Sequence, residues 1–297
     1  MLKKIIIKIS QKIFYITQRL RFFSTNKKRK IFKLIFRNKY RKYDSKKIIN
    51  PEIGYLKLDY QDQTDLKKNI DKCIFDSTKI FQNKKTSSGS KEYLRNILSH
   101  ENKKEIQSFL NFFLNQEIIN IVGEYLSSKP LLVELKLLHS PIIENIEQSG
   151  SQLFHCDYDD DRIVKLFLNI FDTNENSGPL EAISAKKTHM LREQHDINLG
   201  DHTNSVEKNV TNKDIKKFLG LKGDLTVIDT SNCFHRGSFN VTKDRLILYG
   251  NYVSRSSYRF PPILKKMKYE SIIKLHSPLS IYSNLVDSNK KTYLINN

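Results

Sequence analysis

Apolar residues near the start of the chain recur every three or four positions, which is the spacing of one face of an α-helix. These residues are Leu2, Ile5, Ile6, Ile9, Ile13, Ile16, Leu20 and Phe23. Lysines and arginines at positions 4, 8, 12, 19 and 21 occupy much of the remaining surface. The pattern predicts a basic amphipathic helix over residues 2–23. Such a helix can lie on an anionic membrane surface, dock on a partner, or pack on its own domain with its lysines in solvent.

After this basic start, the hydrophobic pattern changes twice. Residues 54–58 alternate like a β-strand, and the apolar spacing over residues 65–126 is helical. The chain then reads as short strands separated by polar turns, of which 163–170, 224–229 and 245–253 are the clearest. Helices followed by many short strands predict an α+β fold whose second half is a β-sandwich or jelly roll.

Two of these strands have side chains of different character on their two faces, because successive residues of a strand point to opposite sides. In the first strand, Val164, Leu166, Leu168 and Ile170 share one face, and Lys165, Phe167 and Asn169 share the other. In the second strand, one face carries Arg245, Ile247, Tyr249 and Asn251, and the other carries Leu246, Leu248, Gly250 and Tyr252. Each strand therefore has one apolar face for a core and one face on which polar and aromatic groups gather.

The positive charge of the chain is concentrated at its start. The 297 residues carry a formal net charge of +19, yet the first 50 residues alone hold 17 lysines and arginines and one acidic residue. The rest of the chain is close to neutral, which argues against a nucleic-acid-binding face on the folded body. We therefore expect a basic N-terminal segment over residues 1–48 and one folded domain over residues 49–297.

Cysteine content and hydropathy bear on the compartment. The three cysteines, Cys73, Cys156 and Cys233, show no spacing typical of a disulfide framework or a zinc ribbon, which fits a reducing compartment. No apolar run approaches the roughly 20 residues that span a bilayer. These features predict a cytoplasmic protein, with residues 2–23 available for peripheral contact with a membrane.

Candidate metal ligands occur at three positions. His155 and Asp157 form a His-X-Asp sequence, and residues i and i+2 of an extended strand project from the same face. Eighty residues later, His235 follows a predicted strand and can add a second imidazole. Two histidines and one carboxylate on one side of an octahedral metal leave positions open, as in non-heme Fe(II) oxygenases. Ten residues further on, Arg245 can hold a dicarboxylate through charge-assisted hydrogen bonds.

The order and spacing of these residues resemble the phytanoyl-CoA dioxygenase family of Fe(II)/2-oxoglutarate-dependent oxygenases. Two further segments carry the resemblance. The sequence Asn-Ser-Gly-Pro-Leu-Glu-Ala-Ile at 176–183, followed by residues 184–189, is similar to the family's NGPL…PGSH segment. The Gly-Asp at 223–224 and the His-Arg-Gly-Ser-Phe-Asn at 235–240 are similar to its GD…HGSxxN…R segment. The motifs span residues 152–252.

The resemblance implies a double-stranded β-helix (jelly roll, cupin-like) with flanking N-terminal helices. It implies that His155, Asp157 and His235 bind Fe(II), and that Arg245 grips the distal carboxylate of the co-substrate 2-oxoglutarate. The implied reaction uses O2 to hydroxylate an unactivated C–H bond of a small, carrier-linked or lipid-linked metabolite. Halogenating relatives replace the carboxylate ligand with a small residue, so the presence of Asp157 favours hydroxylation.

The chain also departs from the family pattern. Residues 184–189 lack the proline and glycine of PGSH, so the local turn must differ. Phe167 falls near the position of a tryptophan that often lines the co-substrate pocket. Residues 184–217 are rich in polar side chains and are expected to form a loop region that shapes the substrate pocket.

Two other functions fit parts of the sequence. The first is a non-catalytic jelly-roll binding or membrane-docking protein that keeps the ligand residues by descent. The second is a metal-dependent glycosyltransferase that uses the Asp-X-Asp formed by Asp157, Tyr158 and Asp159, although this leaves the segment from His235 to Arg245 without a role. A calcium loop over residues 157–168 is disfavoured, because Arg162 and Leu168 stand where glycine and glutamate are needed.

Overall fold

The computed structural model describes residues 45–83, 93–99, 102–128, 130–142, 148–158, 160–197, 205–237, 242–254, 269–274 and 293–296. The predicted helix over residues 2–23 and Asp159 lie outside these residues, so the basic helix and its membrane contact stay predictions. Within the described residues, no helix is long and apolar enough to cross a membrane.

A large sheet forms the centre of the fold. Its strands run in the order β1 (Tyr55–Leu58), β7 (Leu225–Asp229), β4 (Ile163–Asn169), β9 (Arg245–Ser254), β3 (Pro130–Ser140), β10 (Tyr269–Lys274) and β11 (Tyr293–Asn296), and β2 (Arg95–Asn96) pairs with β3. Neighbouring strands are antiparallel, except that β10 and β3 are parallel. The predicted strands over 54–58, 163–170, 224–229 and 245–253 are thereby confirmed within a residue or two at each end.

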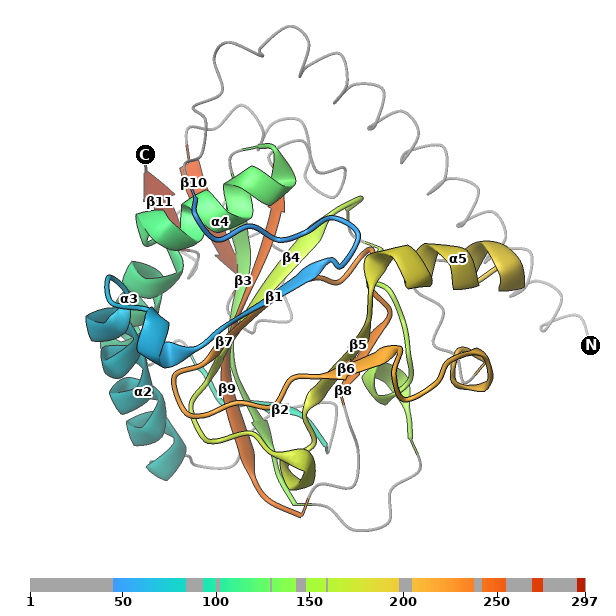
Figure 1. Ribbon diagram of the computed structural model, residues 1–297. Helices are drawn as coiled ribbons and strands as arrows, with labels where there is room; N and C mark the ends of the chain where they lie inside the picture. The colour runs from blue at the N-terminus through green and yellow to red at the C-terminus, as the bar shows by residue number, and fades with distance from the viewer. Residues whose placement is uncertain are drawn as a thin grey trace, which may run out of the picture.

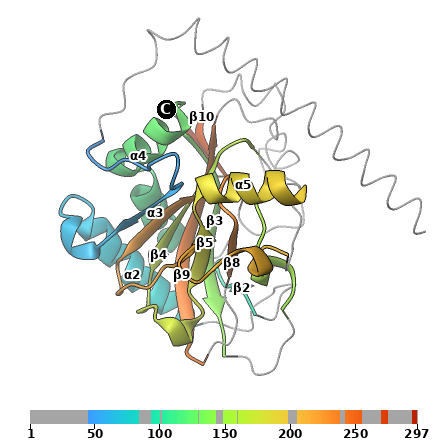
Figure 2. The ribbon, with the colours of Figure 1, turned by 45° about the vertical axis from the view of Figure 1, so that its right-hand side comes forward.

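A second, smaller sheet lies on one side of the large sheet (Figures 1 and 2). It consists of β6 (Ile215–Lys217), β5 (Leu180–Ile183) and β8 (His235–Gly237), all antiparallel. Two sheets joined by crossing connections form the double-stranded β-helix of the predicted fold class. Short 3-10 helices stand at Tyr60–Asp62, Gly150–Gln152, Glu175–Ser177 and Glu207–Asn209.

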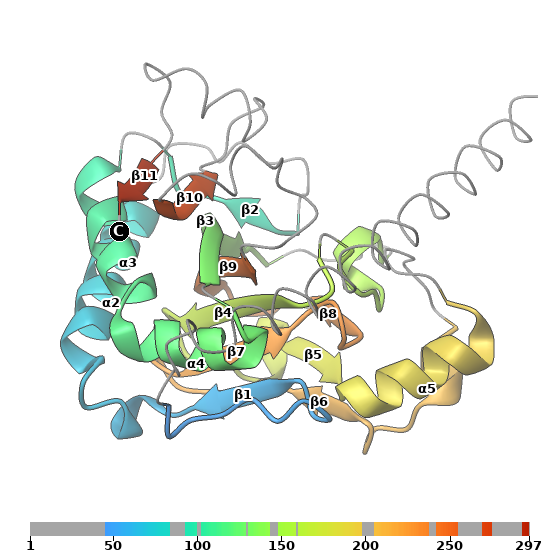
Figure 3. The same ribbon diagram turned by 90° about the horizontal axis from the view of Figure 1, so that it is seen from above.

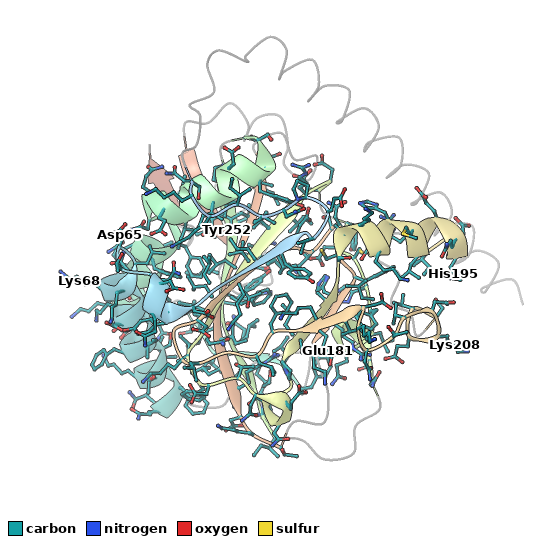
Figure 4. All side chains as sticks on the ribbon, viewed as in Figure 1. Asp65, Lys68, Glu181, His195, Lys208 and Tyr252 are labelled. Atoms are coloured by element: carbon teal, nitrogen blue, oxygen red, sulfur yellow. The ribbon has the colours of Figure 1, made fainter. Side chains whose placement is uncertain are left out.

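Helices cover the other side of the large sheet. They are α2 (Lys67–Gln82), α3 (Lys103–Phe113) and α4 (Gln116–Leu126), which the helical spacing over 65–126 predicts (Figure 3). Asn115 caps α4 because its side chain accepts a hydrogen bond from the backbone N–H of Glu117. The main apolar core lies between these helices and strands β3, β4, β7 and β9. Tyr252 of β9 belongs to this core (Figure 4), and its hydroxyl donates to the carbonyl of Phe113 at 2.7 Å.

The alternation along β4 and β9 decides which side chains meet the helices. Val164, Leu166 and Leu168 of β4 are buried in the helix-facing core, as are Leu246, Leu248 and Tyr252 of β9. The opposite faces of both strands, with Lys165, Phe167, Arg245, Ile247 and Tyr249, line a cavity between the sheets. The sequence prediction of one apolar and one mixed face is confirmed for both strands.

The expectation of a loop over residues 184–217 is wrong in two places. Residues Ala185–His195 form helix α5, and Ile215–Lys217 form β6. Ser184 caps α5 by accepting a hydrogen bond from the N–H of Lys187, and Thr188 and Leu191 are buried beneath the helix. The helix has few apolar residues, so its period is faint in the sequence. Its N-cap and two tertiary contacts stabilise it instead.

Gly250 in the middle of β9 provides a test of the packing between sheet and helices. A Cβ atom at this position would lie 2.5 Å from the ring of Phe113. We expect Gly250→Ala to lower the free energy of unfolding by about 1–3 kcal/mol through overpacking, measured by urea denaturation. In the matched control Gly237→Ala, the nearest atom of the described residues to the added Cβ would be the carbonyl oxygen of Ser151 at 3.7 Å, so its stability should change by less than about 1 kcal/mol. Equal stabilities of the two variants would contradict this account of the core.

Candidate metal centre

The structure brings together the three residues that the sequence singles out as metal ligands. One ligand atom from each of His155, Asp157 and His235 can be chosen so that all three lie within 4.8 Å of one another. His155 and Asp157 stand on the segment between the 3-10 helix at Gly150–Gln152 and strand β4, and His235 opens β8. No other such group of three occurs in the part of the chain that the structure describes.

Backbone hydrogen bonds hold the two histidines next to each other. The N–H of His155 donates to the carbonyl of His235 at 3.1 Å, and the N–H of His235 donates to the carbonyl of His155 at 3.0 Å. The two imidazole rings lie 4.3 Å apart between centroids. The N–H of Asp157 donates to the carbonyl of Thr230 at 2.8 Å, which ties the third residue to the end of β7.

The imidazole rings are oriented by their Nδ1 atoms. Nδ1 of His155 lies 2.9 Å from the carbonyl of Leu153, and Nδ1 of His235 lies 3.1 Å from the carbonyl of Cys233. A carbonyl oxygen can only accept a hydrogen bond, so Nδ1 of each ring carries the hydrogen and the lone pair is on Nε2, where a metal can bind. Burial and the nearby His155 hold the pKa of His235 well below its usual range, so this ring is neutral at neutral pH.

Asp157 is ionised and presents a buried oxygen. Burial alone would raise its pKa, but Lys165 and the two neighbouring histidines together outweigh burial, and the pKa lies well below the usual range. Lys165 Nζ lies 2.5 Å from Asp157 Oδ2, yet this buried oxygen makes no hydrogen bond of normal geometry. The neutral imidazole of His235, the adjacent imidazole of His155 and the ionised carboxylate of Asp157 form a donor set that fits a divalent metal ion.

Arg245 lies in the same cavity as the three candidate ligands. It is 7% exposed, and its guanidinium donates to the hydroxyl of Ser140 at 3.3 Å. Burial lowers its pKa to about 10, so the side chain stays charged at neutral pH. Among the described residues, no carboxylate lies within ion-pair distance of Arg245. A buried cation without a counter-charge is costly, and a bound anion would relieve that cost.

The cavity has a volume of about 360 Å³. Its walls are apolar or aromatic at several positions, and the rings of Phe167 and Tyr249 stand 5.3 Å apart between centroids. The side chains that line it include Leu94, Glu134, Lys136, Leu138, Ser140, Lys165, Phe167, Leu180, Ile247 and Tyr249, together with the three candidate ligands and Arg245. The placement of Phe167 on this wall agrees with its predicted position.

A charged group on the cavity wall was not predicted from the sequence. Lys136 Nζ lies 2.7 Å from one oxygen of Glu134, and the hydroxyl of Tyr249 donates to the other oxygen at 2.8 Å. The contact between Lys165 and Asp157 was also missed. The signal was present as the alternation of Glu134 and Lys136 with apolar residues in β3, but only the pairing of β3 with β9 shows that they face the cavity.

Comparisons with known proteins establish the fold. No protein-family model and no curated protein matches the sequence. Among solved structures, the chain is similar to the epimerase SnoN in complex with Fe3+, alpha ketoglutarate and nogalamycin RO, with a TM-score of 0.51, 13% identity, and coverage of 73% of this chain and 84% of SnoN. It is also similar to EctD from S. alaskensis with 2-oxoglutarate and 5-hydroxyectoine, with a TM-score of 0.50, 12% identity, and coverage of 72% and 84%.

These likenesses place the chain in a class of fold. Together, the fold and the site define a double-stranded β-helix in which two histidines and an aspartate cluster in the cavity between the sheets. At 12–13% identity the comparisons show the fold alone, so the chemistry has to be argued from the residues of this chain.

Removing any one of the three candidate ligands should abolish tight metal binding. We expect His155→Ala, Asp157→Ala and His235→Ala each to weaken Fe(II) binding by more than about 100-fold, since even residues that only support a metal ligand contribute about 10–100-fold. Anaerobic titration calorimetry measures this directly. His189→Ala, which removes an exposed histidine of α5, should bind the metal as the wild type does. Retention of tight binding by any one of the three variants would contradict the assignment of that residue as a ligand.

Proposed function

We propose that this protein is an Fe(II)- and 2-oxoglutarate-dependent dioxygenase that hydroxylates an unactivated C–H bond of a small, carrier-linked or lipid-linked metabolite. One observation carries the proposal. The cluster of His155, Asp157 and His235 shares one cavity with the buried guanidinium of Arg245, which has no carboxylate of the described part of the chain within ion-pair distance. A metal site and an anion site in one cavity match a metal that works with a dicarboxylate co-substrate.

In this proposal each residue has a distinct task. His155, Asp157 and His235 hold the metal on one side and leave the other coordination positions to ligands. Arg245, supported by Ser140, binds the distal carboxylate of 2-oxoglutarate through charge-assisted hydrogen bonds. When bound, Fe(II) with 2-oxoglutarate and O2 supplies the oxidising chemistry, in which R–H, 2-oxoglutarate and O2 become R–OH, succinate and CO2.

In this proposal, the walls of the cavity orient the bound co-substrate and keep water out of the site. Phe167 and Tyr249 form an aromatic boundary, and Leu180 and Ile247 add apolar surface. Apolar walls exclude water, and water exclusion strengthens the electrostatic contacts that position a bound dicarboxylate. The task of the protein is thus to bind, orient and shield the reacting groups.

The two similar structures support the use of iron and 2-oxoglutarate, because SnoN is described with Fe3+ and alpha ketoglutarate and EctD with 2-oxoglutarate and 5-hydroxyectoine. They also frame the choice of reaction, since SnoN is called an epimerase. The ionised carboxylate of Asp157 favours oxygen transfer over halogenation. Hydroxylation adds one oxygen atom to the substrate, whereas epimerisation leaves its mass unchanged, so mass spectrometry of the product separates the two.

The alternative functions are less well supported by the site. An Asp-X-Asp glycosyltransferase would use Asp157 and Asp159, but Asp157 faces two histidines that such an enzyme does not need, and Asp159 lies outside the described residues. A non-catalytic binding protein has no need of an uncompensated Arg245 beside three metal ligands, since unused buried charge lowers stability.

An anaerobic titration tests the proposal. Addition of Fe(II) and then 2-oxoglutarate to the wild-type protein should produce a weak visible metal-to-ligand charge-transfer band. His235→Ala should produce none, because the metal site is lost. The absence of a band in folded wild-type protein would exclude the dioxygenase and favour the binding protein.

Arg245→Ala separates co-substrate binding from metal binding. We expect the variant to keep its Fe(II) affinity while the 2-oxoglutarate concentration needed for half of the band rises by about 10–100-fold, since one charge-assisted bidentate contact is lost. Arg245→Lys keeps the charge but lacks the planar guanidinium, so its affinity for 2-oxoglutarate should lie between those of the wild type and Arg245→Ala. Wild-type 2-oxoglutarate affinity in Arg245→Ala would show that another residue holds the distal carboxylate.

A further inference from the structure

The described side chains that line the cavity carry more positive than negative charges, and this excess of positive charge bears on the substrate. The described residues that line it include three cations, Lys136, Lys165 and Arg245, and two carboxylates, Glu134 and Asp157. Under the proposed function, a divalent metal and a dianionic co-substrate add charges that cancel each other. Among these five described side chains, one positive charge therefore remains unmatched in the loaded protein, however the groups pair.

The contacts of each cation show where the unmatched charge lies. Lys136 is paired with Glu134 at 2.7 Å, and the hydroxyl of Tyr249 satisfies the second oxygen of that carboxylate. Arg245 is assigned to the co-substrate by the proposed function. Lys165 remains.

Among the described residues, Asp157 is the carboxylate within ion-pair distance of Lys165, at 2.5 Å. Lys165 also acts on Glu134 through space, but both oxygens of Glu134 are already bonded. A metal ion bound to Asp157 would neutralise the carboxylate charge that Lys165 pairs with when no metal is bound. The ammonium of Lys165 then needs a new partner, because an uncompensated charge in a cavity is costly.

We propose that the primary substrate carries a carboxylate and that Lys165 binds it next to the metal; this inference rests on the proposed function. A carboxylate matches the single unmatched charge, whereas a phosphate monoester brings about −1.5 to −2. Since Lys165 contacts a metal ligand, the carboxylate lies beside the reacting centre. The oxidised C–H bond is therefore only a few bonds away from it.

The location of Lys165 suits this task. It projects from β4 on the cavity face, where its ammonium lies 5.8 Å from the centre of the Tyr249 ring. Lys136 stands at the same distance from that ring, so the two ammonium groups share the aromatic wall while only Lys136 pairs with Glu134. At about 360 Å³, the cavity is near the lower end of the 300–1,000 Å³ typical of small-molecule sites, and it must also hold the co-substrate. The substrate portion that enters is therefore small.

Matched acids and amides test the inference without knowledge of the substrate. The probes are straight-chain carboxylic acids from acetate to octanoate, each with its primary amide, which has nearly the same shape and no charge. They are added anaerobically to the protein loaded with Fe(II) and 2-oxoglutarate, and binding is read from the shift of the charge-transfer band. We expect at least one acid to bind about tenfold or more tightly than its amide.

Variants of Lys165 assign the preference to this residue. Lys165→Met, which keeps the length of the side chain and removes its charge, should lose the preference for acid over amide. Lys165→Arg should retain it, and the control Lys186→Met, at an exposed position of α5, should bind both probes as the wild type does. The same probe pairs with alkyl phosphates in place of acids give the second arm, and tighter binding of phosphates than of carboxylates would overturn the choice of anion.

The outcomes separate this inference from the proposed function. Absence of the charge-transfer band in the wild type would contradict the proposed dioxygenase function itself. With the band present, a lack of acid preference across the series, or a preference that survives in Lys165→Met, would overturn the inference alone. Loss of the band in Lys165→Met would show that Lys165 only positions Asp157, which also overturns substrate binding by this residue.

Discussion

The pair of backbone hydrogen bonds exchanged by His155 and His235 is the constraint on which the site depends. Each residue donates its N–H to the carbonyl of the other, so two imidazoles that are 80 residues apart in sequence are held with their centroids 4.3 Å apart. The bridge fastens the small sheet to the segment that enters β4, and the bond from Asp157 to Thr230 fastens the same segment to the end of β7. Because backbone bonds fix the direction of side chains, they hold the three candidate ligands close together.

The large sheet separates two kinds of interaction. Its outer face buries apolar side chains beneath three helices, and this burial supplies most of the driving force for folding. Its inner face carries ionised groups that are only partly compensated. Glu134, Lys136 and Tyr249 satisfy one another, whereas the buried Arg245 has, within the described ranges, no carboxylate in ion-pair distance and donates to the hydroxyl of Ser140. Residues that reduce stability in this way are typical of functional sites, where a ligand completes the set of contacts.

Local pattern and tertiary contact contributed differently to the elements of the fold. The strands β4 and β9 and the helices α2 to α4 have regular apolar periods, and these periods predict both their type and their buried face. Helix α5 lacks such a period and was expected to be a loop. Its stability comes from the Ser184 cap and from the burial of Thr188 and Leu191 against the small sheet, and neither contact has a signature along the chain strong enough to outweigh its polar composition.

The sequence by itself determined the fold class, the two faces of the central strands, and the candidate set of His155, Asp157, His235 and Arg245, because residue type and period are local properties. Whether these four residues meet in one cavity was decided by the tertiary structure, since their convergence depends on the pairing of strands far apart in the chain. The same holds for the ion pair of Lys165 with Asp157. A lysine on a strand face has the sequence pattern of a solvated charge, and only the assembled sheets enclose Lys165 in the cavity beside Asp157.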